Sequence, residues 1–186
     1  MDPLIPLFVA VPLAGAFLTM ILGRFITAIP RYMALAVLLF LAFISFWSLV
    51  TGGDGSSVYT LGGWEPVEGV PIGLYLIHDG FSALLLCLIS LVGLLSVTYS
   101  VSYMARYTSE NYFYSLFCLM IAGMNGVVLS GDIFNIYVFL EISAIAVAGL
   151  VILGREPHAV SSGFKYLLAG GLVTGTLLLG TVFLYH

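Results

Sequence analysis

The sequence predicts an all-α integral membrane protein of about six transmembrane helices. Of its 186 residues, 61% are hydrophobic and only 8% are charged. A soluble domain carries roughly 25% charged residues, so this chain has too little polar surface to face water on every side. The apolar residues form separate runs of about 20 residues, the length that crosses a hydrocarbon core of about 30 Å. Composition therefore excludes a soluble enzyme, and the net charge of −4 excludes a basic surface for nucleic acid.

Turn-forming residues separate the predicted helices. The first run follows residues 1–3, which lack the basic segment of a cleaved signal peptide, so we expect a retained helix. Pro and Arg at 30–31 separate the first two runs, and glycines within 52–55 end the second. The turns at 130–132 and 155–157 bound the fifth run. We expect one transmembrane domain over residues 1–186, with helices near 4–23, 32–50, 80–103, 111–130, 133–154 and 160–185.

The arginines predict the orientation of these helices. They all fall on one side of the topology, in the first, third and fifth connections: Arg24, Arg31, Arg106 and Arg155. The positive-inside rule assigns this side to the cytoplasm. The opposite side receives acidic residues and no Lys or Arg: Asp2, Asp54, Glu65, Glu68, Asp79 and Asp132. Both termini are therefore expected to be external.

The long connection between the second and third helices, residues 51–79, is predicted to lie outside. Two short segments of alternating apolar residues, 58–64 and 70–76, flank a turn rich in Pro and Gly. This pattern is typical of a small β-hairpin on the outer face of the membrane. An irregular loop is the alternative interpretation.

Two ionisable residues lie well inside predicted helices, Glu141 on the fifth and Lys165 on the sixth. A Lys or Asp at a helix centre costs roughly 2.5–3.5 kcal/mol to insert on the lower of the contested scales, so we expect partners or a water-filled cavity. Their depths differ by on the order of 10 Å, which favours a water-bridged pathway over a direct salt bridge. Such groups serve as proton relays in pumps. The alternative is that they only bond other helices of a larger assembly.

Asp132 and Asp79 each directly precede a predicted helix. An acid at this position caps the helix and opposes its positive dipole end. We therefore interpret both as helix-end residues, with ion uptake from outside as the alternative role. The three histidines fall at membrane edges or in loops, and we expect them to be solvated or interfacial: His78, His158 and His186. No metal or phosphate motif is present, so we expect no cofactor on this chain.

Three segments together resemble a known family. They are Gly123 to Glu141, the Leu-Gly-Gly-Trp of 61–64 with the Gly-Phe-Ser-Ala-Leu-Leu-Leu of 80–86, and the Phe-Lys-Tyr-Leu-Leu of 164–168. This pattern resembles the antiporter-like subunits, which occur as the D-type subunit of Mrp-type cation/proton antiporters, in respiratory complex I and in membrane-bound hydrogenases. By this resemblance, Glu141 matches the fifth-helix glutamate that family members use in proton translocation. Lys165 matches a lysine found in the sixth helix of many members.

The resemblance implies a subunit of a multi-subunit complex that translocates protons or sodium ions, in the plasma (inner) membrane of a prokaryote. Family members are longer, with an inverted repeat and further lysines on the seventh and eighth helices. Residues 1–186 match their N-terminal six helices, so we expect antiporter-like paralogues and a chain supplying the remaining helices as partners. The alternative is a non-conducting subunit that docks full-length antiporter-like proteins. The chain would not be catalytic alone, and any redox cofactors would sit on other subunits.

Overall fold

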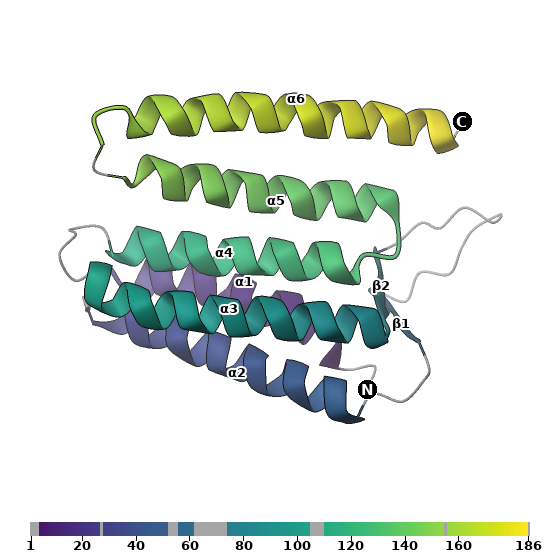
Figure 1. Ribbon diagram of the computed structural model, residues 1–186, viewed down its shortest axis with the longest axis horizontal. Helices are drawn as coiled ribbons and strands as arrows, with labels where there is room; N and C mark the ends of the chain where they lie inside the picture. The colour runs from purple at the N-terminus through teal and green to yellow at the C-terminus, as the bar shows by residue number, and fades with distance from the viewer. Residues whose placement is uncertain are drawn as a thin grey trace.

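The computed structural model describes residues 4–26, 28–51, 56–61, 74–104, 110–154 and 156–185. These residues form six helices and one two-stranded sheet. Successive helices run in opposite directions, as Figure 1 shows. The elements in chain order are α1 (Leu7–Leu22), α2 (Ile29–Thr51), β1 (Ser57–Leu61), β2 (Leu74–His78), α3 (Gly80–Met104), α4 (Glu110–Leu129), α5 (Ile133–Ile152) and α6 (Ala159–Tyr185).

Five of the helices, α2 to α6, are long and apolar enough to cross a membrane. The exception is α1, which has 16 residues where the sequence predicted a span over 4–23. At 1.5 Å per residue it is about 24 Å long, short of a hydrocarbon core of about 30 Å. It starts at Leu7, with Pro6 at the N-cap position and a short turn before it.

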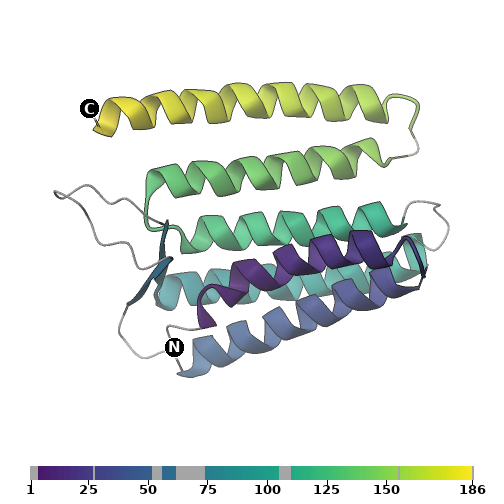
Figure 2. The same ribbon diagram turned by 180° about the vertical axis from the view of Figure 1, so that it is seen from behind.

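The core lies among α1, α2, α3 and α4, whose apolar side chains meet at the centre of the bundle. The largest of the fully buried side chains, Tyr114, comes from α4. Helices α5 and α6 extend the bundle from α4 on one side, so that α4, α5 and α6 lie side by side in both views (Figures 1 and 2). Every helix also exposes large apolar side chains on its outer surface, as expected of a protein surrounded by lipid.

The predicted hairpin is present, although its strands start and end at different residues than expected. β1 and β2 pair antiparallel, with the register running from Ser57 opposite His78 to Leu61 opposite Leu74. The backbone amide of Gly131 donates to the carbonyl oxygen of Tyr75 at 2.9 Å, which ties β2 to the turn between α4 and α5. The sheet therefore links this turn to the start of α3.

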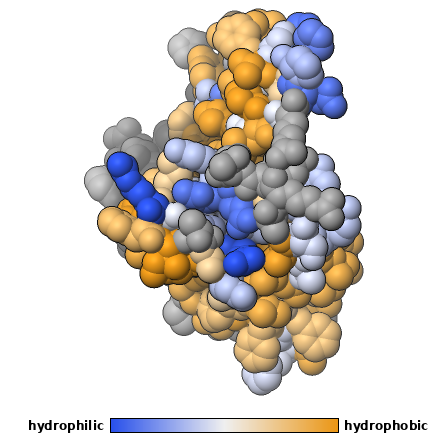
Figure 3. All heavy atoms as spheres, turned by 90° about the vertical axis from the view of Figure 1, so that its left-hand side faces the viewer, coloured by the Kyte–Doolittle hydropathy of each residue, from blue (hydrophilic) through white to orange (hydrophobic). Residues whose placement is uncertain are grey.

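Both chain ends lie at the end of the bundle that carries the sheet (Figure 1). Asp79 and Asp132 precede α3 and α5 at this same end. Arg24 and Arg31 lie at the opposite end, beside the turn between α1 and α2. Figure 3 looks onto that opposite end, where hydrophilic side chains gather among apolar ones. These four residues lie at the ends that the sequence predicted for them, and the assignment of the arginine end to the cytoplasm stays a prediction.

Several charged residues used in the orientation argument lie outside the described part of the chain. They are Asp2, Asp54, Glu65, Glu68, Arg106 and Arg155. His186, which was expected to be solvated or interfacial, also lies outside the described residues.

Candidate functional site

Helix α5, which carries Glu141, is held closely against α4. A Cβ atom added to Gly123 of α4 would lie 2.9 Å from the carbonyl oxygen of Phe139 and 2.9 Å from the amide nitrogen of Ser143. The Ser143 hydroxyl donates to the carbonyl oxygen of Met120 on α4 at 3.4 Å. Phe139 and Ser143 are four residues apart and therefore share the face of α5 that packs on α4.

The opposite face of α5 packs on α6. A Cβ atom on Gly170 of α6 would lie 4.0 Å from the Cβ of Ala144, and one on Gly163 would lie 3.1 Å from the carbonyl oxygen of Ala148. Glu141 is three residues before Ala144 and seven before Ala148, so it lies on this same face. The structure therefore places Glu141 on the side of α5 that is turned toward α6.

The Glu141 side chain is half-buried. The Oε2 atom is buried and, among the described residues, accepts no hydrogen bond. An ionised carboxylate in an apolar site is costly unless a proton, a cation, water or a hydrogen-bond donor satisfies it. A role of this group in ion translocation stays a prediction.

Lys165 lies on the other side of α6 and is exposed. It follows Gly163 by two residues, and two residues turn an α-helix by about 200°, so the side chain leaves the face opposite to α5. Lys165 is also near the level of Ala148 of α5, and Ala148 is about 10 Å from Glu141 along the axis of α5. The structure does not bring the two predicted relay residues together, because Lys165 lies on the side of α6 that is turned away from α5 and Glu141.

The two predicted helix-end acids do cap helices. An oxygen of Asp132 accepts a hydrogen bond from the backbone amide of Phe134 at 3.0 Å, at the start of α5. At the start of α3, Asp79 accepts from the amide of Ser82 at 2.7 Å, and its own amide donates to the Ser82 hydroxyl at 2.7 Å. Hydrogen bonding of Ser82 to the Asp79 carboxyl group, by its backbone amide first and by its side chain second, lowers the pKa of Asp79. A role of either acid in ion uptake stays a prediction.

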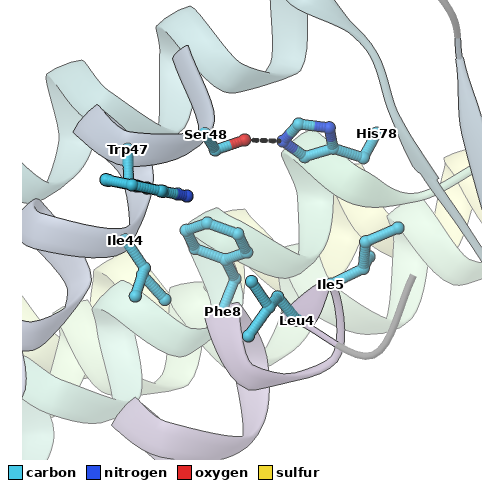
Figure 4. A pocket seen from close by; sticks show the side chains of 7 residues that line it. All are labelled: Leu4, Ile5, Phe8, Ile44, Trp47, Ser48 and His78. Carbon is cyan, nitrogen blue, oxygen red and sulfur yellow. Dashed lines mark hydrogen bonds between the residues drawn. The ribbon is translucent and has the colours of Figure 1, made fainter. Parts of the chain in front are cut away.

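His78 is buried, so the expectation of a solvated or interfacial histidine was wrong. Its side chain is 7% exposed, and its Nε2 atom lies 2.9 Å from the Ser48 hydroxyl. The imidazole also stacks on the Phe8 ring at 6.2 Å (Figure 4). Together they line a small apolar pocket with Leu4, Ile5, Ile44 and Trp47. Strand alternation could have found this, since His78 shares a face of β2 with Leu76, which is 2% exposed.

The buried histidine makes stability pH-dependent. Burial lowers the pKa of His78 from its ordinary value of 6.5, while Asp79 raises it by a smaller amount. The unfolded chain therefore binds a proton more readily than the folded one, and stability is lost as the pH falls below 6.5. We expect the melting temperature of the detergent-solubilised protein to fall by a few degrees from pH 7.5 to pH 5.5.

The substitution His78→Gln should reduce this loss, because glutamine stays neutral at both pH values. His158→Gln is the matched control, since His158 is exposed in the turn before α6. The control should keep the full pH dependence of the original protein. If the melting temperature of His78→Gln falls between pH 7.5 and pH 5.5 by as much as that of the original protein, the pH dependence comes from other groups.

Comparison with known proteins shows a consistent set of relatives. Residues 64–114 match the family described as NADH-ubiquinone oxidoreductase (complex I), chain 5 N-terminus. The chain is 40% identical over 132 residues to a probable K(+)/H(+) antiporter subunit (type D) of Rhizobium meliloti, covering 70% of this chain and 23% of that protein. It is 34% identical over 184 residues to NADH-quinone oxidoreductase subunit N of Desulforudis audaxviator, covering 98% of this chain and 35% of that protein.

The fold is similar to that of a solved subunit as well. A chain in the structure of the Mrp complex from Dietzia sp. matches with a TM-score of 0.82 at 28% sequence identity, covering 96% of this chain and 33% of that one. The present chain thus spans about a third of these proteins or less. The resemblance that the sequence motifs predicted is confirmed by both sequence and structure.

Proposed function

Because this chain is homologous to the N-terminal part of antiporter-like membrane subunits, we propose that it is a subunit of a membrane complex that translocates protons or sodium ions. The observation that carries the proposal is the Glu141 carboxyl group, which lies within a helix long enough to span the membrane and keeps one buried oxygen without a partner among the described residues. Ionisable residues are rare in such helices and mark ion pathways and proton relays.

In this proposal Glu141 is the relay group. A proton bound at its carboxyl group neutralises the charge and lowers the cost of burial, and release of the proton restores the charged form. A sodium ion can occupy the same oxygen, because hard cations bind carboxylates. The close packing of α5 on α4 holds the carboxyl group at a fixed depth.

Lys165 has a different position and therefore a different proposed role. It presents a positive charge on the face of α6 that is turned away from α5, where a neighbouring helix of the complex would meet it. A charge in this position acts on Glu141 through the low-dielectric interior and not by contact. In this proposal Glu141 is therefore the relay carboxylate, and Lys165 is a more distant basic group and not its direct partner.

The partners in this proposal are other membrane subunits, including antiporter-like paralogues and a polypeptide that supplies the helices beyond the sixth. Residues 1–186 would form one transmembrane domain, in the plasma membrane of a prokaryote. The arginine end would face the cytoplasm, and the sheet and both termini would lie outside.

A non-conducting structural subunit is the second candidate. The separation of Lys165 from Glu141 favours it, because within the described residues no basic side chain reaches the carboxyl group. Both candidates place the chain in a complex, so transport measurements must distinguish them.

The membership in a complex is tested by mild detergent extraction of native membranes and mass spectrometry of the co-purifying chains. We expect stoichiometric membrane subunits with antiporter-like sequences. A chain that purifies alone, at the size of its own monomer or dimer, would contradict the proposal.

A further inference from the structure

Helix α6 buries two polar side chains although most of its surface is exposed. Thr174 is 8% exposed and Thr181 is 4% exposed. The helix lies at the edge of the bundle, and the element it packs against is α5 (Figures 1 and 2). The two threonines are therefore buried by α5. They are seven residues apart, which places both on one face of α6.

The register between the helices places Thr174 at the level of Glu141. The two helices run in opposite directions, and Gly170 lies against Ala144. Thr174 is about one turn after Gly170, and Glu141 is about one turn before Ala144. Both side chains therefore reach the same level, on the two faces that meet.

The hydroxyl group of Thr174 is bonded within its own helix. It donates to the carbonyl oxygen of Gly170 at 3.1 Å and lies 3.4 Å from that of Gly171, the local bonding that is common for a threonine inside a helix. Glu141 supplies another acceptor in Oε2, which is buried without a donor among the described residues. A hydrogen bond to a charged carboxylate is stronger than one to a backbone carbonyl.

We propose that Thr174 is a positioning residue for Glu141, and that its hydroxyl donates to the ionised carboxylate and returns to the Gly170 carbonyl when the carboxyl group is protonated. This rests on the proposed relay role of Glu141 and adds the group that stabilises its charged form. Thr181, two turns further along the same face, extends the polar side of the α5–α6 contact toward the sheet end.

The test compares four forms of the complex: unaltered, Thr174→Val, Thr174→Ser and Thr176→Val. Valine keeps the shape of threonine and removes the hydroxyl, whereas serine keeps the hydroxyl. Thr176 is the matched control, because its hydroxyl also donates to a backbone carbonyl, that of Leu172 at 2.8 Å, but it is exposed on another face of α6. Melting temperatures confirm that each variant is folded.

The measurement is an infrared titration of the Glu141 carboxyl band, which is assigned by its absence in Glu141→Gln. We expect Thr174→Val to move the midpoint of this titration to higher pH by about one unit, because a hydrogen bond to the charged form is lost. Thr174→Ser and Thr176→Val should titrate like the unaltered complex. An unshifted midpoint in Thr174→Val, or an equal shift in Thr176→Val, would overturn the proposal.

The infrared result separates this proposal from the relay function. If the midpoint shifts as expected while Glu141→Gln still transports ions, Thr174 positions a carboxylate that is not the relay. If Glu141→Gln stops transport while Thr174→Val leaves the midpoint unchanged, the relay function holds and the role of Thr174 is lost.

Discussion

The substitution Glu141→Gln is expected to reduce ion translocation to the background of vesicles that lack the complex. Glutamine has nearly the shape of glutamate but cannot bind and release a proton, and it carries no charge to hold a sodium ion. A positioned proton-transfer group commonly contributes a factor of about 10²–10⁴ in rate. The measurement is ion-driven pH change inside vesicles that contain the reconstituted complex, followed with an entrapped pH-sensitive dye.

Glu156→Gln provides the matched control for this experiment. Glu156 undergoes the same chemical change but is exposed in the turn between α5 and α6, so transport should be unaffected. The amount of assembled complex must also be equal in both variants. Full transport by assembled Glu141→Gln would reject the relay and favour the structural subunit.

The largest effect on stability is expected from Gly126→Ala in α4. A Cβ atom at this position would overlap the ring of Phe139 on α5, and Gly126 is itself buried. Phe139 cannot move aside easily, since its backbone also lies against Gly123. Overpacking of this kind costs about 1–3 kcal/mol, and here it would push away the helix that carries Glu141. We expect a lower melting temperature in detergent and reduced transport.

Gly180→Ala on α6 is the control, because a Cβ atom there would meet nothing within 4 Å. That variant should be as stable as the original protein, or more stable by up to about 1 kcal/mol from the better helix propensity of alanine. The double variant Gly126→Ala with Phe139→Leu should recover part of the lost stability, since leucine leaves room for the new methyl group. Equal melting temperatures for Gly126→Ala and Gly180→Ala would show that α4 and α5 are not in close contact.

Much of the fold follows from the sequence. Long apolar runs predict helices, because a backbone in lipid must satisfy its own hydrogen bonds. Helices α2 to α6 appear where these runs are, and the residue before α5 caps it as its position predicts. The pairing of β1 with β2 was also expected, although the alternating pattern did not fix which residues pair.

The sequence misjudged features that depend on neighbours distant along the chain. It treated His78 as solvated, but Phe8 of α1 and Ser48 of α2 enclose it. The enclosure of His78 depends on how separate elements meet, which no local window of sequence records.

By itself the sequence determined that this is a membrane protein, where its helices lie, which residues carry charge within them, and that Glu141 is the carboxylate to test. Only the tertiary structure decided that Glu141 faces α6, that Thr174 lies at its level and that Lys165 points away. The physical reason is that these helices are apolar on all sides. No amphipathic stripe marks the face that packs, so the direction of each polar side chain is set by close contacts between helices, such as those at Gly123, Gly126 and Gly170.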